Sequence, residues 1–251
     1  MRTEKLSASQ PNLKRRTLLL ASALLALSNV GQGRTEGVSM RHIVLLGDSV
    51  FDNKAYVGGG PDVIQQLRSI TPAEWQSTLT AVDGALTADV KAQLKRVPSA
   101  ATHLVVSAGG NDALREAGVL DQPARSVAEA LEKVAAARDR FRRNYAAMLD
   151  QVAMRGLPTA VCTIYEPRFP EPQRRRLAAT ALAILNDCIT REAFSRGLTL
   201  IDLRVLLDEV ADFANPIEPS VRGGMKLARA ALQFSAQLQD EGRVIARLPS
   251  G

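Results

Sequence analysis

Five short apolar segments, each separated from the next by a longer stretch, constrain the fold of this chain most strongly. They are bounded by Gly, Pro, Asn or Asp, as expected for strands that are buried on both faces of a sheet. Strands that alternate with helices predict βαβ units, and therefore an α/β fold with an open parallel sheet. No linker divides the body of the chain, so we expect residues 40–251 to form a single domain. We expect strands at 42–47, 76–82, 102–108, 158–165 and 198–202, and helices at 61–70, 87–97, 124–155, 171–195 and 222–240.

Residues 1–39 differ from the rest of the chain and fit two interpretations. Three basic residues, 14–16 (KRR), precede the uncharged apolar run 18–27 (LLLASALLAL). This order is typical of an export signal and is compatible with the twin-arginine route; the protein would then be periplasmic or secreted. Alternatively, translation starts at Met40, directly before the first expected strand, and the protein is cytoplasmic. The apolar run is much shorter than the roughly 20 residues of a membrane-spanning helix, so we expect no stable membrane span.

The charge of the chain does not indicate a nucleic-acid partner. The net charge of the 251 residues is +6, but residues 1–39 hold six basic and two acidic residues, which leaves +2 on residues 40–251. Aromatic residues make up only 4% of the chain, which argues against a surface that stacks bases. Two cysteines and two histidines are too few for a His/Cys metal cluster, so we predict no metal and no cofactor.

Polar motifs directly follow several of the expected strands. Residues 47–53 (GDSVFDN) follow the first strand, Gly84 lies in the loop after the second, and residues 109–112 (GGND) follow the third. Residues 215–220 (NPIEPS) come after the fifth. In open α/β sheets, ligands bind beyond the carboxyl ends of the strands, so we expect these segments to form one site. An exposed serine hydroxyl with glycine N–H and asparagine amide donors nearby is the combination that acyl transfer requires.

In these motifs the sequence resembles the SGNH hydrolases, also called the GDSL esterase/lipase family, over most of residues 42–240. The resemblance implies a flavodoxin-like, three-layer α/β/α sandwich around a five-stranded parallel sheet. It implies that Ser49 is the nucleophile and that the N–H groups of Ser49 and Gly84, with the side-chain amide of Asn111, form the oxyanion hole. The reaction it implies is cleavage of a carboxylic ester of a small molecule, carbohydrate or lipid through an acyl-enzyme.

The final motif departs from the family pattern, which is Asp-x-x-His. Asn215 stands at the Asp position and Glu218 at the His position. His42 and His103 are not expected to replace the missing histidine, because both begin expected strands and therefore lie at the opposite end of the sheet from Ser49. In one interpretation Glu218 is an atypical base, and Asn215 orients it by donating an N–H to its carboxylate. In the other, the protein is a weak or inactive relative that binds an acylated or glycosylated ligand.

Four further residues are expected to bind the substrate. Two adjoin the nucleophile and the oxyanion-hole asparagine in sequence, and two follow the nucleophile by a few residues. They are Asp48, Gly110, Asn53 and Tyr56, next to the catalytic set Ser49, Gly84, Asn111, Asn215 and Glu218.

Overall fold

The structure is a computed structural model that describes residues 40–237 together with residues 244 and 245. The expected leader, residues 1–39, lies outside the described residues. Contacts along the chain group Met40–Gly251 in one compact unit. No helix in the described part of the chain is long and apolar enough to cross a membrane.

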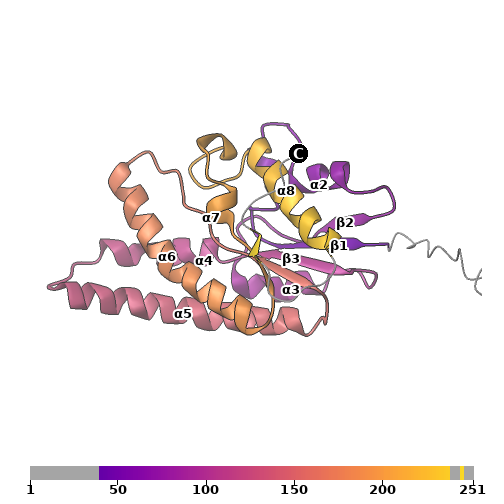
Figure 1. Ribbon diagram of the computed structural model, residues 1–251. Helices are drawn as coiled ribbons and strands as arrows, with labels where there is room; N and C mark the ends of the chain where they lie inside the picture. Colours follow the sequence, from indigo (N-terminus) through magenta and orange to yellow (C-terminus); the bar gives the residue numbers. More distant parts are fainter. Residues whose placement is uncertain (1–39, 238–243, 246–251) are drawn as a thin grey trace, which may run out of the picture. The chain divides into compact units, whose positions relative to one another are not determined.

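A parallel sheet forms the centre of this unit (Figure 1). Its strand order is β2-β1-β3-β4-β5-β6. The five predicted strands are all present in a flavodoxin-like order, which confirms the predicted α/β fold. A two-residue strand, β6, adds to the edge beside β5. The strands are β1 (His42–Gly47), β2 (Gln76–Leu79), β3 (His103–Ser107), β4 (Thr159–Cys162), β5 (Thr199–Ile201) and β6 (Val244–Ile245).

Two strands, β2 and β4, each end three residues earlier than the sequence predicts. β2 ends at Leu79, because the next two N–H groups along the chain both bond to the Leu45 carbonyl and interrupt the ladder. β4 ends at Cys162, because the Asn186 side chain bonds both the N–H and the carbonyl of Ile164 and takes them out of the sheet. Both changes turn the chain at the carboxyl edge of the sheet, where the polar motifs lie.

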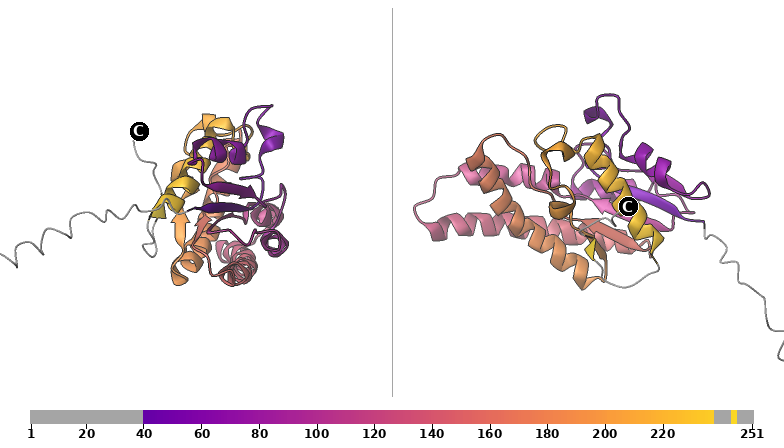
Figure 2. Two further views of the ribbon diagram at one scale, coloured as in Figure 1. Left: turned by 90° about the vertical axis from the view of Figure 1, so that its right-hand side faces the viewer. Right: turned by 45° about the horizontal axis from the view of Figure 1, so that its top comes forward.

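Helices cover both faces of the sheet and make three layers (Figures 1 and 2). Ile43 and Leu45 of β1 pack with α2, α7 and α8, whereas Val44 and Leu46 pack with α3, α5 and α6. All four side chains are completely buried, as a doubly covered parallel strand requires. The helices are α2 (Val63–Ile70), α3 (Val90–Leu94), α4 (Gly110–Glu116), α5 (Val127–Ala153), α6 (Pro172–Ser195), α7 (Leu203–Leu206) and α8 (Val221–Ala236).

Local capping and strand ends decide where the helices begin. The Ser126 hydroxyl accepts a hydrogen bond from the Glu129 N–H, so α5 begins at Val127 and not at residue 124 as the periodicity predicts. The predicted helix 87–97 is a 3₁₀ turn followed by the short α3. Helices α4 and α7 were not predicted, because each is a short helix within a segment interpreted as a loop.

The connections from β1 determine where the polar motifs meet. The chain forms α2 and β2 on one side of β1 and then crosses to form β3 on the other side. The segments that follow β1 and β3 therefore diverge, which opens a crevice at the carboxyl ends of these two strands. Asp48, directly after β1, and Gly110, which begins α4, both line this crevice.

Candidate active site

The carboxyl end of β1 makes a sharp turn that only glycine permits. Gly47 has φ +123°, and a Cβ atom there would lie 1.6 Å from the Ser107 carbonyl oxygen. The Gln93 side chain holds this turn: its Oε1 accepts from the Gly47 N–H and its Nε2 donates to the Gly47 carbonyl, each at 2.7 Å. We did not predict a role for Gln93. A buried polar residue on the otherwise apolar face of α3 was the available signal.

The turn presents Ser49 to the crevice. The Asp48 carbonyl accepts hydrogen bonds from the N–H groups of Phe51 and Asp52, and its carboxylate accepts one from the Val50 N–H. Ser49 is therefore held in a closed turn and is only 8% exposed. Its hydroxyl donates to Oε1 of Glu218, with an oxygen–oxygen distance of 3.2 Å. The structure thus joins the predicted nucleophile and the predicted base, which lie 169 residues apart in sequence.

The loop that carries Glu218 is held by main-chain contacts from distant segments. Phe213 and Pro219 form an antiparallel bridge, the Tyr165 hydroxyl donates to the Ile217 carbonyl, and the Asn53 amide donates to the Pro219 carbonyl. These contacts fix the backbone on both sides of Glu218. The carboxylate position is therefore set by the fold and not by its neighbour in sequence.

Asn215 does not orient Glu218 in the way that we predicted. Its side-chain oxygen accepts from the N–H groups of Ile217 and Glu218, at 2.9 and 3.0 Å, and so closes a turn in the loop. Among the described residues, Oε2 of Glu218 is buried and has no hydrogen-bond partner. The expected N–H donation from Asn215 to the carboxylate is therefore wrong: the amide shapes the loop through its oxygen.

Asn53 is also not the pocket residue that we predicted. It is completely buried, and both ends of its amide bind main chain: Oδ1 accepts from the Val63 N–H that begins α2, and Nδ2 donates to the Pro219 carbonyl. Asn53 therefore joins the Glu218 loop to α2, and it lies outside the lining of the crevice.

Burial dominates the electrostatics of the site. It raises the pKa of the Glu218 carboxyl to about 7; the hydrogen bond from Ser49 opposes this shift, and the charge on Asp83 adds to it. Burial likewise raises the pKa of Asp48 to about 7, against the hydrogen bond from Val50, with the charge on Glu218 contributing. Loss of water disfavours the charged form of a carboxyl, which explains the direction of both shifts.

Two of the predicted oxyanion-hole residues lie in neighbouring segments, one in the loop after β2 and one in the first turn of α4. Asn111, in the first turn of α4, lines the crevice beside Ser49, and its side-chain N–H donates to the Ala85 carbonyl at 3.0 Å. Gly84 precedes Ala85 in an exposed turn and has φ +77°. The bond from Asn111 thus ties the Gly84 loop to α4 and leaves the second N–H of the amide for another acceptor.

Tyr56 is not part of the crevice lining. Its hydroxyl donates to the Asp83 carboxylate at 2.8 Å, a bond that raises the pKa of Tyr56 to about 12. With Phe169, Asn215 and Glu218 it borders a small hollow of about 370 Å³. The larger crevice, of about 710 Å³, contains Asp48, Ser49, Gly110, Asn111 and Glu218.

Both histidines lie where the strand directions placed them, away from the site. His42 begins β1 and its Nε2 contacts the Thr78 hydroxyl; His103 begins β3 and its Nδ1 contacts the Thr102 hydroxyl, each at 2.8 Å. Burial lowers the pKa of both rings. Neither reaches Ser49, which follows the opposite end of β1.

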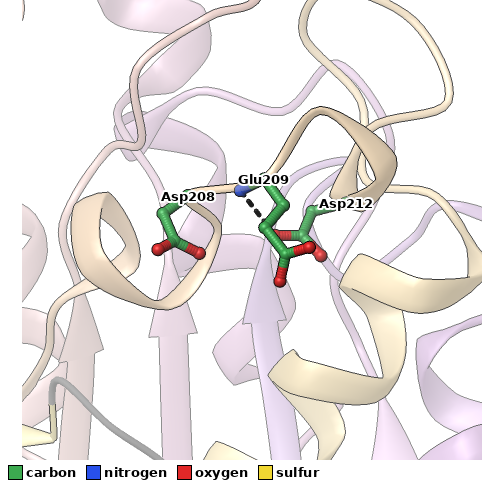
Figure 3. Close-up of side chains that lie close together, drawn as sticks. All are labelled: Asp208, Glu209 and Asp212. Carbon is green, nitrogen blue, oxygen red and sulfur yellow. Dashed lines mark hydrogen bonds between the residues drawn. The ribbon is translucent and has the colours of Figure 1, made fainter.

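An acidic cluster directly precedes the Glu218 loop in sequence. The carboxylates of Asp208, Glu209 and Asp212 lie close together there (Figure 3). Its cations come from α8. The Lys226 ammonium lies 2.7 Å from a carboxylate oxygen of the completely buried Asp212, and Arg222 pairs with Asp212 and Glu209. The cluster is therefore an ion-pair network that joins α8 to the chain just before the Glu218 loop.

Removing the Lys226 ammonium is expected to destabilise the fold. Among the described residues, the Lys226→Met variant leaves the buried Asp212 carboxylate with Arg222 as its one cation and with the hydrogen bond from the Glu209 N–H, so the free energy of unfolding should fall by about 3 kcal/mol. Urea unfolding at pH 7 measures this difference. Lys226→Arg keeps the pair and serves as the control, and Asp212→Asn combined with Lys226→Met should recover part of the loss. A loss below about 0.5 kcal/mol in Lys226→Met would contradict a stabilising role.

The chain is similar to known proteins in both sequence and structure. The sequence pattern of the GDSL-like Lipase/Acylhydrolase family matches residues 45–224. No curated protein matches the chain. Among solved structures, an extracellular lipase from Streptomyces rimosus is 20% identical, with a TM-score of 0.57 over 78% of this chain and 100% of that one.

Two other solved structures give the same picture. A phospholipase A1 from Streptomyces albidoflavus is 17% identical, with a TM-score of 0.58 over 79% of this chain and 100% of that one. A lipolytic G-D-S-L family protein from Veillonella parvula is 15% identical, with a TM-score of 0.59 over 79% and 100% of the two chains. At these identities the likeness shows the fold, while the family pattern covers more than half of the chain. The chain therefore belongs to the GDSL-like lipase/acylhydrolase family.

Proposed function

We propose that the protein is a serine esterase-like hydrolase that cleaves carboxylic esters through an acyl-enzyme. The observation that carries this proposal is the hydrogen bond from the Ser49 hydroxyl to Glu218, formed between two buried side chains at the carboxyl edge of the sheet. A nucleophile in contact with a base, beside amide donors, is the arrangement that acyl transfer uses.

The proposed reaction proceeds in two halves. In the first, Oγ of Ser49 attacks the ester carbonyl carbon while its proton passes to Glu218; the bond from that carbon to the alcohol oxygen then breaks, and the alcohol leaves with the proton. In the second, water attacks the acyl-enzyme, again giving a proton to Glu218. The carbon–Oγ bond breaks, Ser49 recovers the proton, and the carboxylic acid leaves.

Glu218 can replace the family's histidine because of its environment. A glutamate in water, with a pKa of about 4.3, is a much weaker base than a histidine at about 6.5. In this site burial raises the pKa of Glu218 to about 7, which is the range that suits a general base near neutral pH. The Asn53, Tyr165 and Asn215 contacts supply the positioning that the family's aspartate gives to its histidine.

The oxyanion is proposed to bind the N–H groups of Ser49 and Gly84 and the side chain of Asn111. The bond from Asn111 to the Ala85 carbonyl holds the amide in place, so its second N–H can donate to the charge that develops on the carbonyl oxygen. Such a donor acts mainly in the transition state and therefore raises kcat more than it lowers KM.

Asn111→Ala is expected to lower kcat about 10²–10³-fold and to change KM little. Steady-state kinetics on an aryl ester measure both constants. Glu74→Ala, an exposed residue before β2, should leave both constants within about twofold. A KM effect without a kcat effect would show that Asn111 binds the ground state and the transition state equally, which contradicts a role in the oxyanion hole.

One observation favours the second interpretation, a relative that binds an acylated or glycosylated ligand without efficient turnover. Oε2 of Glu218 lacks a hydrogen-bond partner among the described residues, so the carboxylate lacks the orienting contact that Asn215 was predicted to make. A panel of aryl and alkyl esters, assayed with the wild type and with Ser49→Ala, separates the two. Turnover that depends on Ser49 supports the hydrolase, and ligand binding with no turnover supports the second interpretation.

A further inference from the structure

The apolar stripe of α5 continues beyond the hydrophobic core. Phe141 and Tyr145 are completely buried, and Val134, toward the N-terminus, lines the crevice. Leu131 and Val127 continue the same spacing but are 60% and 78% exposed. Steps of three and four residues keep all five side chains on one face of the helix. The stripe therefore runs from the core, through the crevice, to an uncovered apolar end.

The other walls of the crevice repeat this pattern. On α6, Leu185 is buried, Leu182 is half-buried and Leu177 is 43% exposed; Leu114 of α4 and Leu120 of the following 3₁₀ turn are 48% and 39% exposed. All five line the crevice. Figures 1 and 2 show that the N-terminal halves of α5 and α6 extend beyond the carboxyl ends of the strands and diverge there. Apolar side chains from three segments thus surround one opening.

Three polar side chains of the crevice walls are already engaged. The Thr163 hydroxyl donates to Asp202, the Tyr165 hydroxyl donates to main chain, and Glu116 pairs with Arg140. A sugar hydroxyl placed beside these three groups would lose its bonds to water without finding replacements there. A hydrocarbon chain would lose only unfavourable contact with water.

We propose that this crevice binds the acyl chain of the ester substrate, and that the chain is unbranched, apolar and of medium to long length. The inference rests on the proposed function, which places the ester carbonyl at Ser49. From Ala137 to Val127 the apolar face of α5 extends for about 15 Å; Ala137 and Val134 line the crevice, and Leu131 and Val127 continue this face beyond the lining. A fully extended hydrocarbon chain of roughly eight to twelve carbons spans most of that length.

The chain-length profile of the enzyme tests this proposal. We expect kcat/KM for p-nitrophenyl esters, each kept below its critical micelle concentration, to rise at least about 100-fold from acetate to decanoate, since each buried methylene contributes up to about fourfold. If the wild type cleaves the acetate ester as efficiently as the decanoate ester, the proposed acyl-chain site is overturned while the esterase proposal stands.

A pair of matched substitutions on α6 tests whether the acyl chain of the substrate lies in the crevice. Ala181 lines the crevice, so Ala181→Phe should lower the ratio of decanoate to acetate kcat/KM at least about tenfold by filling the space. Ala183 is exposed and outside the crevice lining, so Ala183→Phe should leave the ratio unchanged. Leu177→Asn, at the exposed rim, should lower the ratio without affecting the melting temperature. A ratio that is unchanged in both crevice variants overturns the proposal.

A binding measurement keeps the inference independent of turnover. In Ser49→Ala, calorimetry should detect 2-dodecanone binding at least about 100-fold tighter than 2-butanone, and Ala181→Phe should weaken it. If no ester is cleaved but 2-dodecanone binds, the esterase proposal fails and the proposed acyl-chain site stands. If neither ketone binds, the proposed acyl-chain site is overturned. If, in addition, sedimentation shows that Leu131→Ser converts a dimer into monomers, the apolar stripe of α5 is a contact between two copies of the protein.

Discussion

Replacing Ser49 by alanine is expected to lower kcat for ester hydrolysis by at least about 10⁴-fold, to the residual rate that the oxyanion hole and substrate binding alone supply. The variant loses the atom that forms the acyl-enzyme, and loss of the nucleophile costs about 10⁶-fold in the best-studied serine hydrolases. The fold should be unaffected, because within the described part of the chain the Ser49 hydroxyl bonds only to Glu218. Burst kinetics on an aryl ester, with circular dichroism as a check of folding, measure the effect.

A chemical label identifies the nucleophile independently of the variant. An ethyl fluorophosphonate should add one phosphonyl group to Ser49, with loss of fluoride, and peptide mass spectrometry should find it on residues 47–53. Ser235, which is buried on α8 and bonds the Ala231 carbonyl, provides the control: Ser235→Ala should keep both activity and labelling. Activity that persists in Ser49→Ala would overturn the proposed nucleophile.

Replacing Glu218 by glutamine is expected to lower kcat about 10²–10⁴-fold. In the wild type, kcat/KM should rise about tenfold per pH unit below 7 and level off above it, because Glu218 must be deprotonated and its pKa is about 7. In Glu218→Gln the residual rate should lose this dependence. Rate profiles between pH 5 and 9 measure both effects, and Glu74→Gln serves as the matched control on an exposed carboxylate.

Stability should change in the opposite direction to activity. The pKa of Glu218 lies above its ordinary value of 4.5 in the folded protein, so the folded state binds more protons than the unfolded state between pH 4.5 and 7. The contribution of Glu218 to the free energy of unfolding therefore falls as pH rises through this range. Glu218→Gln lacks this loss and keeps the acceptor for the Ser49 hydroxyl, so it should be more stable than the wild type at pH 8. A variant that is both less stable at pH 8 and unchanged in its pH–rate profile would contradict a role as the base.

A double variant tests whether the loop can hold the family's usual base. Asn215→Asp combined with Glu218→His restores the Asp-x-x-His pattern, and recovery of activity relative to Glu218→Gln would show that the loop geometry is compatible with it. The pH at which half of the rate is lost should then move toward the ordinary pKa of histidine, about 6.5. An unchanged midpoint would indicate that a different group titrates.

Much of the fold followed from the sequence because its signals are local. Apolar residues on both faces of β1 and β3 require cover on two sides, and strands alternating with helices require parallel pairing. The ends of β2 and β4 did not follow, since they depend on Leu45 and Asn186, which lie elsewhere in the chain. The local periodicity of apolar residues does not predict where a strand ends when that end depends on a hydrogen-bond partner far away in sequence.

For the candidate active site, too, some features followed from the sequence and others depended on the tertiary structure. The sequence by itself determined which chemical groups follow the strands: Ser49 after β1, Asn111 after β3, and Glu218 where the family has histidine. Only the tertiary structure decided that Asn53 is a buried fastening, that Asn215 binds main chain, and that the stripes of α5 and α6 enclose a crevice. The physical reason is that burial and hydrogen-bond partners come from segments far apart in sequence. The pKa of Glu218 is the clearest case: its carboxyl group is given by one residue, but its strength as a base is set by the surroundings that remove it from water.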